Sequence, residues 1–209
     1  YKEGYADKIH FQHFTLPKQS DKTPRALSRE SFEKIRDVEI PAYRKSHILA
    51  RDMFLFSFYT RGMSFIDMAY LKKSDLKNGI ITYRRRKTGQ QLTVKWEKCM
   101  EDIIAKYGEN TATRYLLPII TNPCSDERTQ YRNAICRINV ALKEVAGLAG
   151  LNIPLTMHVA RHCWASVAKS KNIPLSVISE GMGHDSEETT RIYLASLDTS
   201  VVDKANSLI

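Results

Sequence analysis

The spacing of apolar residues along the chain predicts a mostly helical protein. In segment 43–59 the apolar positions Leu49, Met53 and Phe56 recur every three or four residues, which places them on one face of a helix. Segment 129–146 repeats this spacing, and its apolar residues are expected to face inward. Both segments are therefore predicted to be amphipathic helices.

Shorter helices are expected where a capping residue or a proline precedes a helical pattern. Ser28 and Thr156 are residue types that commonly cap a helix N-terminus, and Pro174 suits the start of a helix. Gly62 ends the helix before it and precedes a short apolar segment. The predicted shorter helices are 27–35, 64–71, 98–106, 156–170, 174–183 and a last helix that starts at Asp185 or Ser186 and contains Tyr193.

A single antiparallel hairpin interrupts the helices in the middle of the chain. Asn78-Gly79 is a pair that favours tight turns, and the segments 80–86 and 91–96 read as strands. Residues 87–90 are expected to form the tip between these strands. The predicted fold class is therefore mostly α with a small antiparallel β-sheet.

The first residues differ in character from the rest of the chain. Residues 1–25 mix charge, aromatic residues and proline without a clear period, so they are expected to be a linker. The remainder, residues 26–209, is long enough to form one large domain, in which 107–127 is expected to be a loop. The sequence begins at Tyr1 rather than methionine, so we expect it to be a fragment of a longer protein.

Charge and cysteine spacing narrow the classes of partner. The 32 Lys and Arg residues exceed the 23 Asp and Glu residues and give a formal net charge of +9, which favours nucleic acid as a partner over a membrane. The four cysteines form no C-x-x-C pair, so neither a zinc knuckle nor a redox dithiol is indicated. The sequence contains no apolar run as long as a membrane span and no signal peptide. We therefore expect a cytoplasmic protein with reduced thiols.

The stretch from 158 to 193 concentrates groups that suit phosphate chemistry. His158 and Arg161 are three residues apart, so on a helix they share a face and can reach one ligand. An arginine together with His158 and His184 suits a phosphate, because N–H donors pair with its oxygens. Tyr193 follows His184 by nine residues and can act as a nucleophile, because nearby positive charge favours its deprotonation. Each residue alone also fits a structural role, whereas the ordered set is far more specific.

In order and spacing, these residues resemble the catalytic domain of tyrosine recombinases, the phage-integrase family of site-specific DNA recombinases. The resemblance rests on His158-x-x-Arg161-His162, Met182-Gly183-His184 with Thr189-Thr190, Tyr193, Arg86-Lys87-Thr88-Gly89 and the segment from Arg61 to Asp67. It extends from about residue 30 to the end of the chain. The resemblance implies an enzyme that cleaves and rejoins DNA, most closely an integrase or invertase of a bacterial mobile element.

The resemblance also implies a role for each matching residue. Tyr193 would attack the scissile phosphate and form a 3′-phosphotyrosyl link, which retains the energy for rejoining without ATP. Arg161, His158 and His184 would stabilise the pentacoordinate transition state, so that no metal or other cofactor is expected. Lys87 would be the general acid for the leaving 5′ oxygen, although the sequence alone fits a solvated turn lysine equally well.

Double-stranded DNA and further copies of the protein are the partners that the resemblance implies, in a tetrameric synapse without membrane contact. The run Arg84-Arg85-Arg86 and the pair Lys72-Lys73 are candidates for contacts to DNA phosphates. A DNA-clamping domain would precede the linker, and the apolar tail 201–209 would pack on a neighbouring protomer. His162 is expected to pack or hydrogen-bond within its helix.

One position departs from the pattern of the family. Ser64 stands where an arginine is usual, whereas Asp67 matches the acidic residue that normally follows. A serine cannot pair with a phosphate as an arginine does, so the second arginine has to come from elsewhere or is missing. Arg85 is the first candidate, because alternation along a strand would turn Arg85 and Lys87 to the same face. Arg61, three residues before Ser64, is the second candidate.

Two other functions stay open at this point. A member of the family that binds DNA without cleaving it is one alternative, and Ser64 is the feature that favours it. An enzyme of the type IB topoisomerase kind, which relaxes DNA without recombining it, is the other. The short catalytic region and the surroundings of His184 argue against the topoisomerase.

Overall fold

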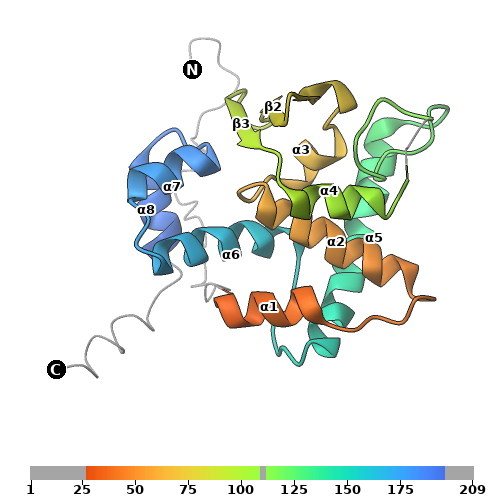
Figure 1. Cartoon of the computed structure of the whole chain (residues 1–209), viewed down its shortest axis with the longest axis horizontal. Helices are drawn as coiled ribbons and strands as arrows, with labels where there is room; N and C mark the ends of the chain where they lie inside the picture. The colour runs from red at the N-terminus through yellow and green to blue at the C-terminus, as the bar shows by residue number, and fades with distance from the viewer. Residues whose placement is uncertain (1–26, 109–111, 196–209) are drawn as a thin grey trace, which may run out of the picture.

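The structure is a computed structural model that describes residues 27–108 and 112–195 (Figure 1). Its elements, in chain order, are α1 (Arg29–Asp37), α2 (Lys45–Tyr59), α3 (Phe65–Ala69), the 3-10 turn η1 (Lys73–Asp75), β1 (Leu76–Lys77), β2 (Ile80–Arg84), β3 (Gln91–Lys95), α4 (Lys98–Ala105), α5 (Glu127–Leu148), α6 (Met157–Ser170), α7 (Leu175–Met182) and α8 (Glu187–Ala195). The fold class predicted from the sequence, mostly α with a small antiparallel sheet, is confirmed. The predicted linker 1–25 and tail 201–209 lie outside the described residues.

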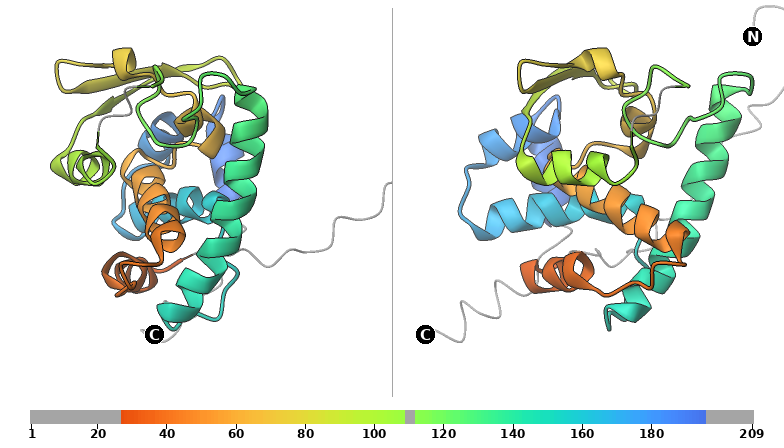
Figure 2. Two further views of the ribbon diagram at one scale, coloured as in Figure 1. Left: turned by 90° about the vertical axis from the view of Figure 1, so that its right-hand side faces the viewer. Right: turned by 45° about the vertical axis from the view of Figure 1, so that its right-hand side comes forward.

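Helix α2 runs through the centre of the molecule, and the other helices surround it. Four consecutive residues on it, Met53 to Phe56, are buried, so it is covered on all sides rather than along one stripe. Helices α4, α5 and α6 pack against it, and α1 lies along its lower side in Figure 1. Figure 2 shows the long helix α5 as one wall of the molecule beside α2.

The sheet is a three-stranded antiparallel meander in the order β1-β2-β3. Ile81 of β2 pairs with Val94 of β3, and both side chains are buried toward the core. The turn predicted at Asn78-Gly79 joins β1 to β2, and both residues have positive φ, which favours Gly and Asn. The short strand β1 was not expected from the sequence.

The strand predicted for residues 80–86 is present as β2, but it ends at Arg84, two residues earlier than predicted. Residues 85–90 form a closed loop, in which the Arg85 N–H donates to the Gln90 carbonyl at 2.9 Å and the Gly89 N–H donates to the Arg85 carbonyl at 2.8 Å. Gly89 has φ +73°, which a strand does not permit. The loop leaves the ladder two residues before the alternating pattern would end.

Most predicted helix starts are confirmed, and their caps differ in kind. The hydroxyl of Ser28 accepts the Ser31 N–H at 3.1 Å at the start of α1, and Ser64 does the same for Asp67 at the start of α3. Thr156 precedes α6 as expected, but its side chain makes no capping bond. The Met157 N–H of that helix instead donates to the side chain of Asn139 at 3.0 Å.

The buried apolar side chains of the described residues form two clusters of unequal size. The main core extends from α1 through α2, α3, the sheet, α4 and α5 to the first turns of α6. The second, which we call the C-terminal cluster, consists of Ala165, Ala168, Ile178, Met182 and Leu194. Helix α6 belongs to both, because its first half contributes to the main core and its second half to the C-terminal cluster.

Candidate active site

Arg161 lies at the junction of the two clusters and is only 8% exposed. One terminal nitrogen of its guanidinium donates to the Gly62 carbonyl at 2.9 Å, and the other donates to the Met182 carbonyl at 2.6 Å. Burial, together with the charge of Arg85, lowers the pKa of Arg161 from its ordinary value. The guanidinium is therefore held in a fixed orientation by backbone groups on both sides of the site.

Gly62 makes this arrangement possible. A Cβ atom on Gly62 would lie 2.8 Å from the Arg161 Cα and 2.7 Å from its Cγ, closer than packed atoms approach. Its φ of +77° is also a conformation that L side chains rarely adopt. The backbone turn after α2 can therefore press directly against α6 only because residue 62 has no side chain.

Two histidines of α6 lie one turn apart on the face next to Arg161. The rings of His158 and His162 meet edge to face with centroids 4.5 Å apart. Desolvation of the ring, followed by the charges of Arg161 and Lys87, lowers the pKa of His158. Burial, followed by the neighbouring His158 ring and the charge of Arg161, lowers the pKa of His162 to about 4. Both imidazoles are therefore neutral near pH 7.

His184 follows the end of α7 and is oriented by two backbone features and one side chain. Gly183 adopts the left-handed conformation with φ +64° and ends the helix, after which the His184 N–H donates to the Ser179 carbonyl at 3.0 Å. The ring Nδ1 lies 2.7 Å from the hydroxyl of the fully buried Thr190. A hydroxyl that donates to Nδ1 leaves the proton of the neutral ring on Nε2. Burial, with the charges of Arg161, lowers the pKa of His184 to about 4.

Tyr193 is placed on α8 against these histidines. Its ring stacks on that of His162 with centroids 4.3 Å apart and an interplanar angle of 1°, and the His184 ring meets it at 5.7 Å and 68°. Burial raises the pKa of Tyr193 above its ordinary value, and the positive charge of Arg161 acts in the opposite direction. The structure thus brings together all four residues that the sequence indicated as the centre of the site.

The loop between β2 and β3 reaches the same place from the opposite side. The guanidinium of Arg85 donates to the Gly183 carbonyl, next to His184. The prediction that strand alternation orients Arg85 and Lys87 is wrong, because both residues lie beyond the end of β2. The loop itself brings Arg85 to the site, and the charge of Lys87 contributes to the lowered pKa values of His158 and His184.

Helix α3 anchors this loop through a buried carboxylate. Asp67 is 5% exposed and accepts the Ser64 hydroxyl at 2.6 Å and the Arg86 backbone N–H at 2.8 Å. The Arg86 guanidinium lies over the ring of Tyr70, with 3.8 Å between its central carbon and the ring centroid. Ser64, which stands at the usual arginine position, therefore serves as a helix cap and a donor to Asp67.

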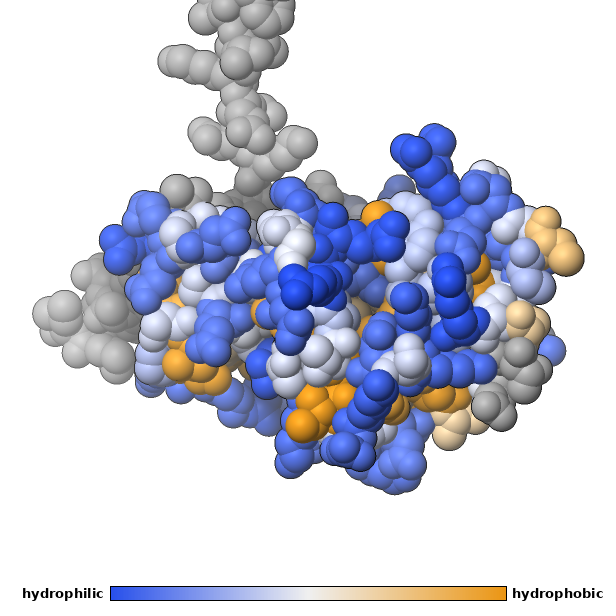
Figure 3. Space-filling model, turned by 90° about the horizontal axis from the view of Figure 1, so that it is seen from above, coloured by the Kyte–Doolittle hydropathy of each residue, from blue (hydrophilic) through white to orange (hydrophobic). Residues whose placement is uncertain are grey.

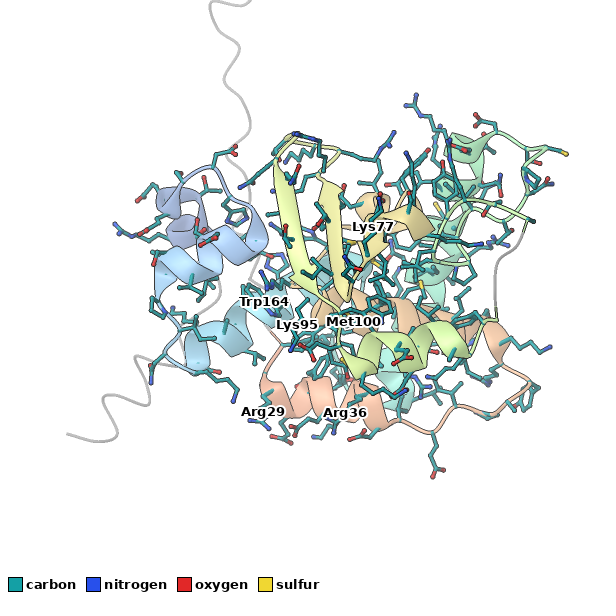
Figure 4. The ribbon with its side chains drawn as sticks, turned by 45° about the horizontal axis from the view of Figure 1, so that its top comes forward. Arg29, Arg36, Lys77, Lys95, Met100 and Trp164 are labelled. Atoms are coloured by element: carbon teal, nitrogen blue, oxygen red, sulfur yellow. The ribbon has the colours of Figure 1, made fainter. Side chains whose placement is uncertain are left out.

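Arg61 approaches the site from the turn after α2. It has φ +60°, which is uncommon for a residue with a side chain, and its Cδ lies 3.6 Å from where a Cβ on Gly181 would be. Trp164 contacts the same glycine where α6 and α7 meet (Figure 4). Within the described part of the chain, the Arg61 guanidinium makes no hydrogen bond or ion pair. The aliphatic part of Arg61 therefore lies against α7 at Gly181.

The remaining cations predicted to contact DNA gather beside the sheet. Arg84 and Arg86 line a hollow of about 300 Å³ with Lys72 and Tyr70, and the Arg84 guanidinium donates to the Gly89 carbonyl at 3.1 Å. Lys73 is half-buried in η1. The face that contains the hairpin, seen from above in Figure 3, is largely hydrophilic, with apolar residues in small separate areas.

Two residues of the site have a larger role in the structure than the sequence predicted. Thr190 belongs to the resemblance but was given no role, and it orients His184. His162 was expected to be structural within its own helix, whereas it contacts Tyr193 of α8. Away from the site, His47 of α2 makes a similar long-range contact, because its Nε2 lies 2.8 Å from Glu144, 97 residues away. Such contacts depend on the packing of distant helices and leave no local signal.

In residues 27–108 and 112–195, no three or more His, Cys, Asp and Glu side chains are grouped so that they could hold a metal ion. Among the same residues, no helix has the length and apolar character needed to cross a membrane.

Comparison with known proteins places these features in a family. Residues 30–200 match the sequence model of the phage integrase family. The chain is 27% identical over 198 residues to the tyrosine recombinase XerA of Thermococcus onnurineus, covering 91% of this chain and 64% of that protein. It is 26% identical over 179 residues to XerA of Pyrococcus furiosus, covering 85% and 59%. The chain thus spans about three fifths of the length of these relatives.

Solved structures share the fold at lower sequence identity. XerH recombinase bound to its difH substrate after cleavage superposes with a TM-score of 0.68 at 21% identity, covering 97% of this chain and 59% of that one. The XerA recombinase gives 0.64 at 21% identity, with 93% and 66% covered. The catalytic core of lambda integrase gives 0.54 at 18% identity, with 76% and 91% covered. From the match over most of its length, we conclude that the chain belongs to the phage integrase family, the tyrosine recombinases.

Proposed function

We propose that the chain is the catalytic domain of a site-specific DNA recombinase that cleaves through a 3′-phosphotyrosyl intermediate formed by Tyr193. The observation that carries this proposal is the convergence of Arg161, His158, His184 and Tyr193 from α6, α8 and the end of α7. Relatives named tyrosine recombinase, and solved relatives bound to DNA, support the same reaction class. The net charge of +9 suits double-stranded DNA as the substrate.

Arg161 is the principal phosphate-binding group in this proposal. A guanidinium has five N–H donors, and those to Gly62 and Met182 use two of them, which leaves three for a phosphate. The two backbone contacts fix the plane of the guanidinium before DNA arrives. Such preorganised donors stabilise the extra negative charge of a pentacoordinate phosphorus without reorganisation during the reaction.

The protons of the reaction can be placed on residues of the site. Tyr193 loses its proton as its oxygen bonds to phosphorus, and the neutral imidazole of His158 is the available acceptor, whereas the Nε2–H of His184 is a donor to the phosphate. The bond from phosphorus to the 5′ oxygen breaks, and Lys87 supplies the proton to that oxygen. The new phosphodiester to tyrosine conserves the bond energy, so rejoining by a second 5′ hydroxyl needs no ATP, and no metal or cofactor is assigned a step.

Arg85 is our proposal for the second arginine that Ser64 does not provide. Its guanidinium donates to the Gly183 carbonyl, and its charge acts on both Arg161 and His184. Arg61 is the rival, but its aliphatic part lies over Gly181 at the edge of α7. Arg85 is therefore closer to the groups that would surround the phosphate.

The proposal also covers how several copies of the protein assemble on DNA and what the protein does in the cell. A lambda integrase tetramer bound to a Holliday junction is among the solved relatives, and it supports a tetrameric synapse for this protein. The tail 201–209 is proposed to pack on a neighbouring protomer. Arg84, Arg86, Lys72 and Lys73 are proposed to contact DNA phosphates beside the site. We propose a cytoplasmic integrase or invertase of a bacterial mobile element.

Supercoiled plasmid carrying two target sites separates this function from its alternatives. A recombinase converts the plasmid into deletion or inversion products. A family member that only binds DNA shifts the plasmid on a gel without changing its topology, and a topoisomerase-like enzyme relaxes it without exchanging sequences. Recombinant product that disappears in Tyr193→Phe is the expected result, and relaxation alone would contradict the proposal.

A further inference from the structure

The ring of His162 lies between two groups of the proposed reaction. On one side it meets the edge of the His158 ring, with centroids 4.5 Å apart, and on the other it stacks flat on Tyr193 at 4.3 Å. An interplanar angle of 1° makes the second contact a parallel stack of the two rings. His162 therefore joins the phosphate-binding helix α6 to the helix that carries the nucleophile.

Helix α8 is held in the structure by several kinds of contact. It packs on α7, and within the C-terminal cluster its buried apolar residue is Leu194. The hydrogen bond between the Thr190 hydroxyl and the His184 ring fixes the first half of the helix. The stack on His162 relates the ring of Tyr193 directly to α6, on which Arg161 and His158 are placed.

The environment of His162 suits a packing ring better than an acid or base. Its Nδ1 is buried and has no hydrogen-bond partner among the described residues. Burial lowers its pKa to about 4, so the ring is neutral over the range in which the protein would act. A neutral imidazole presents a flat face of nearly the same size as one side of a phenol ring, and stacked rings favour a defined orientation.

We propose that His162 is a positioning residue that, through its ring face, sets the orientation of Tyr193 relative to the phosphate held by Arg161. This inference rests on the proposed nucleophilic function of Tyr193. The required property is a flat aromatic face at position 162, and the imidazole nitrogens are not needed. A displacement of about 1 Å of a reacting group can cost on the order of a hundredfold in rate, so the loss of this face should slow attack.

Single-turnover cleavage of a nicked suicide substrate at saturating DNA tests the proposal. His162→Ala should lower the rate of covalent adduct formation by about ten- to a hundredfold, with DNA affinity changed by less than about threefold. His162→Phe, which keeps a flat ring, should restore the rate to within about threefold of the wild-type protein. His47→Ala, on α2 away from the site, is the matched control and should cleave normally.

Two results would overturn the proposal: an unchanged rate in His162→Ala, or a rate in His162→Phe as low as in His162→Ala. The second result would show that the imidazole itself does chemistry. Thermal unfolding is measured for each variant, and His162→Leu, which fills a similar volume without a flat face, replaces an alanine variant that does not fold.

A measurement without DNA separates this inference from the proposed function. With 3-fluorotyrosine placed at position 193, the ¹⁹F resonance should have similar shifts in the wild-type protein and His162→Phe, and should move and narrow in His162→Ala. An unchanged resonance in His162→Ala would refute the stack as the orienting contact. Absence of any adduct from the wild-type protein would refute the proposed function, whereas the fluorine spectra would still report whether His162 orients the ring.

Discussion

The main core and the C-terminal cluster support two different halves of the same site. The main core is large, includes the buried middle of α2, and holds the turn at Gly62 and the first turns of α6. The C-terminal cluster contains five buried residues and supports α7, α8 and Tyr193. Arg161 joins the halves, since it donates to the Gly62 carbonyl on one side and to the Met182 carbonyl on the other.

This difference in size suggests that the main core keeps its half of the site rigid, whereas the C-terminal cluster lets its half move. A phosphate-binding group has to be preorganised, and the main core provides that for Arg161. A nucleophile has to approach and leave a phosphate during cleavage and rejoining, and a small cluster opens locally at lower cost than a large one. Mutations in the two regions should therefore fail in different ways.

The largest expected effect is the removal of the nucleophile. Tyr193→Phe should form no covalent adduct, while its affinity for DNA stays close to that of the wild-type protein, because only one hydroxyl is lost. Adduct formation is measured on a suicide substrate and affinity by a gel shift. An adduct that persists in this variant would move the nucleophile to another residue.

The next effect concerns the cations that face the phosphate. Arg85→Ala should slow cleavage about a hundred- to a thousandfold with little loss of binding, because one donor to the transition state is removed. Arg61→Ala should slow it less, since Arg61 lies over Gly181 at the edge of α7. Single-turnover rates at saturating DNA rank the two, and the reverse order would assign the role to Arg61. If neither variant were slower, Arg161 would act as the sole arginine.

Two substitutions that each create a cavity, one in the main core and one in the C-terminal cluster, test whether the two regions respond differently. Phe54 in the main core and Met182 in the C-terminal cluster are both fully buried. Phe54→Ala should destabilise the whole domain by about 3–5 kcal/mol, and Met182→Ala should cost about 2–5 kcal/mol. Hydrogen exchange should rise throughout the domain in the first variant and mainly in α7 and α8 in the second. Equal exchange throughout in Met182→Ala would contradict separate behaviour of the cluster.

Lowering the pH should destabilise α7 and α8 before it destabilises the main core. The pKa of His184 is lowered from 6.5 to about 4, so the unfolded chain binds its proton more readily, and stability falls as the pH drops from 6.5 toward 4. His162 acts in the same direction. The protection of α7 and α8 amides, corrected for the pH dependence of intrinsic exchange, should therefore fall as the pH drops from 6.5 to 4.5, and His184→Asn should reduce that fall. Protection that is independent of pH in this range would contradict the assignment.

The smallest expected effect is that of metal removal. Cleavage in excess EDTA should proceed at the rate measured without it, because the proposed charge stabilisation comes from Arg161, His158 and His184. A loss of activity that added magnesium restores would overturn the metal-free mechanism. The same assay with Arg85→Ala asks whether a cation becomes helpful once a donor is missing.

The sequence was informative wherever a property is local. The helix of Ser28, the short helix after Ser64, the start of α7 after Pro174 and the order of the reactive residues each have a signature within a few positions. The face shared by His158 and Arg161 follows directly from helical spacing.

The sequence was less informative where distant segments decide the outcome. The end of β2 depends on the loop that Arg85 closes with Gln90, and on Asp67 and Gly183, which hold that loop from α3 and α7. Arg85 was selected for its strand face, yet it reaches the site through a loop contact with Gly183, 98 residues away. Long-range hydrogen bonds of this kind leave no periodic pattern in the sequence from which they could be predicted.

Trapping and mapping the covalent intermediate tests the central claim most directly. The protein is incubated with a nicked suicide substrate, the adduct is digested with protease, and mass spectrometry identifies the residue linked to the DNA. The account predicts a single adduct that joins the oxygen of Tyr193 to a DNA 3′ phosphate. An adduct on another residue or at a 5′ phosphate, or DNA binding without any adduct, would contradict it.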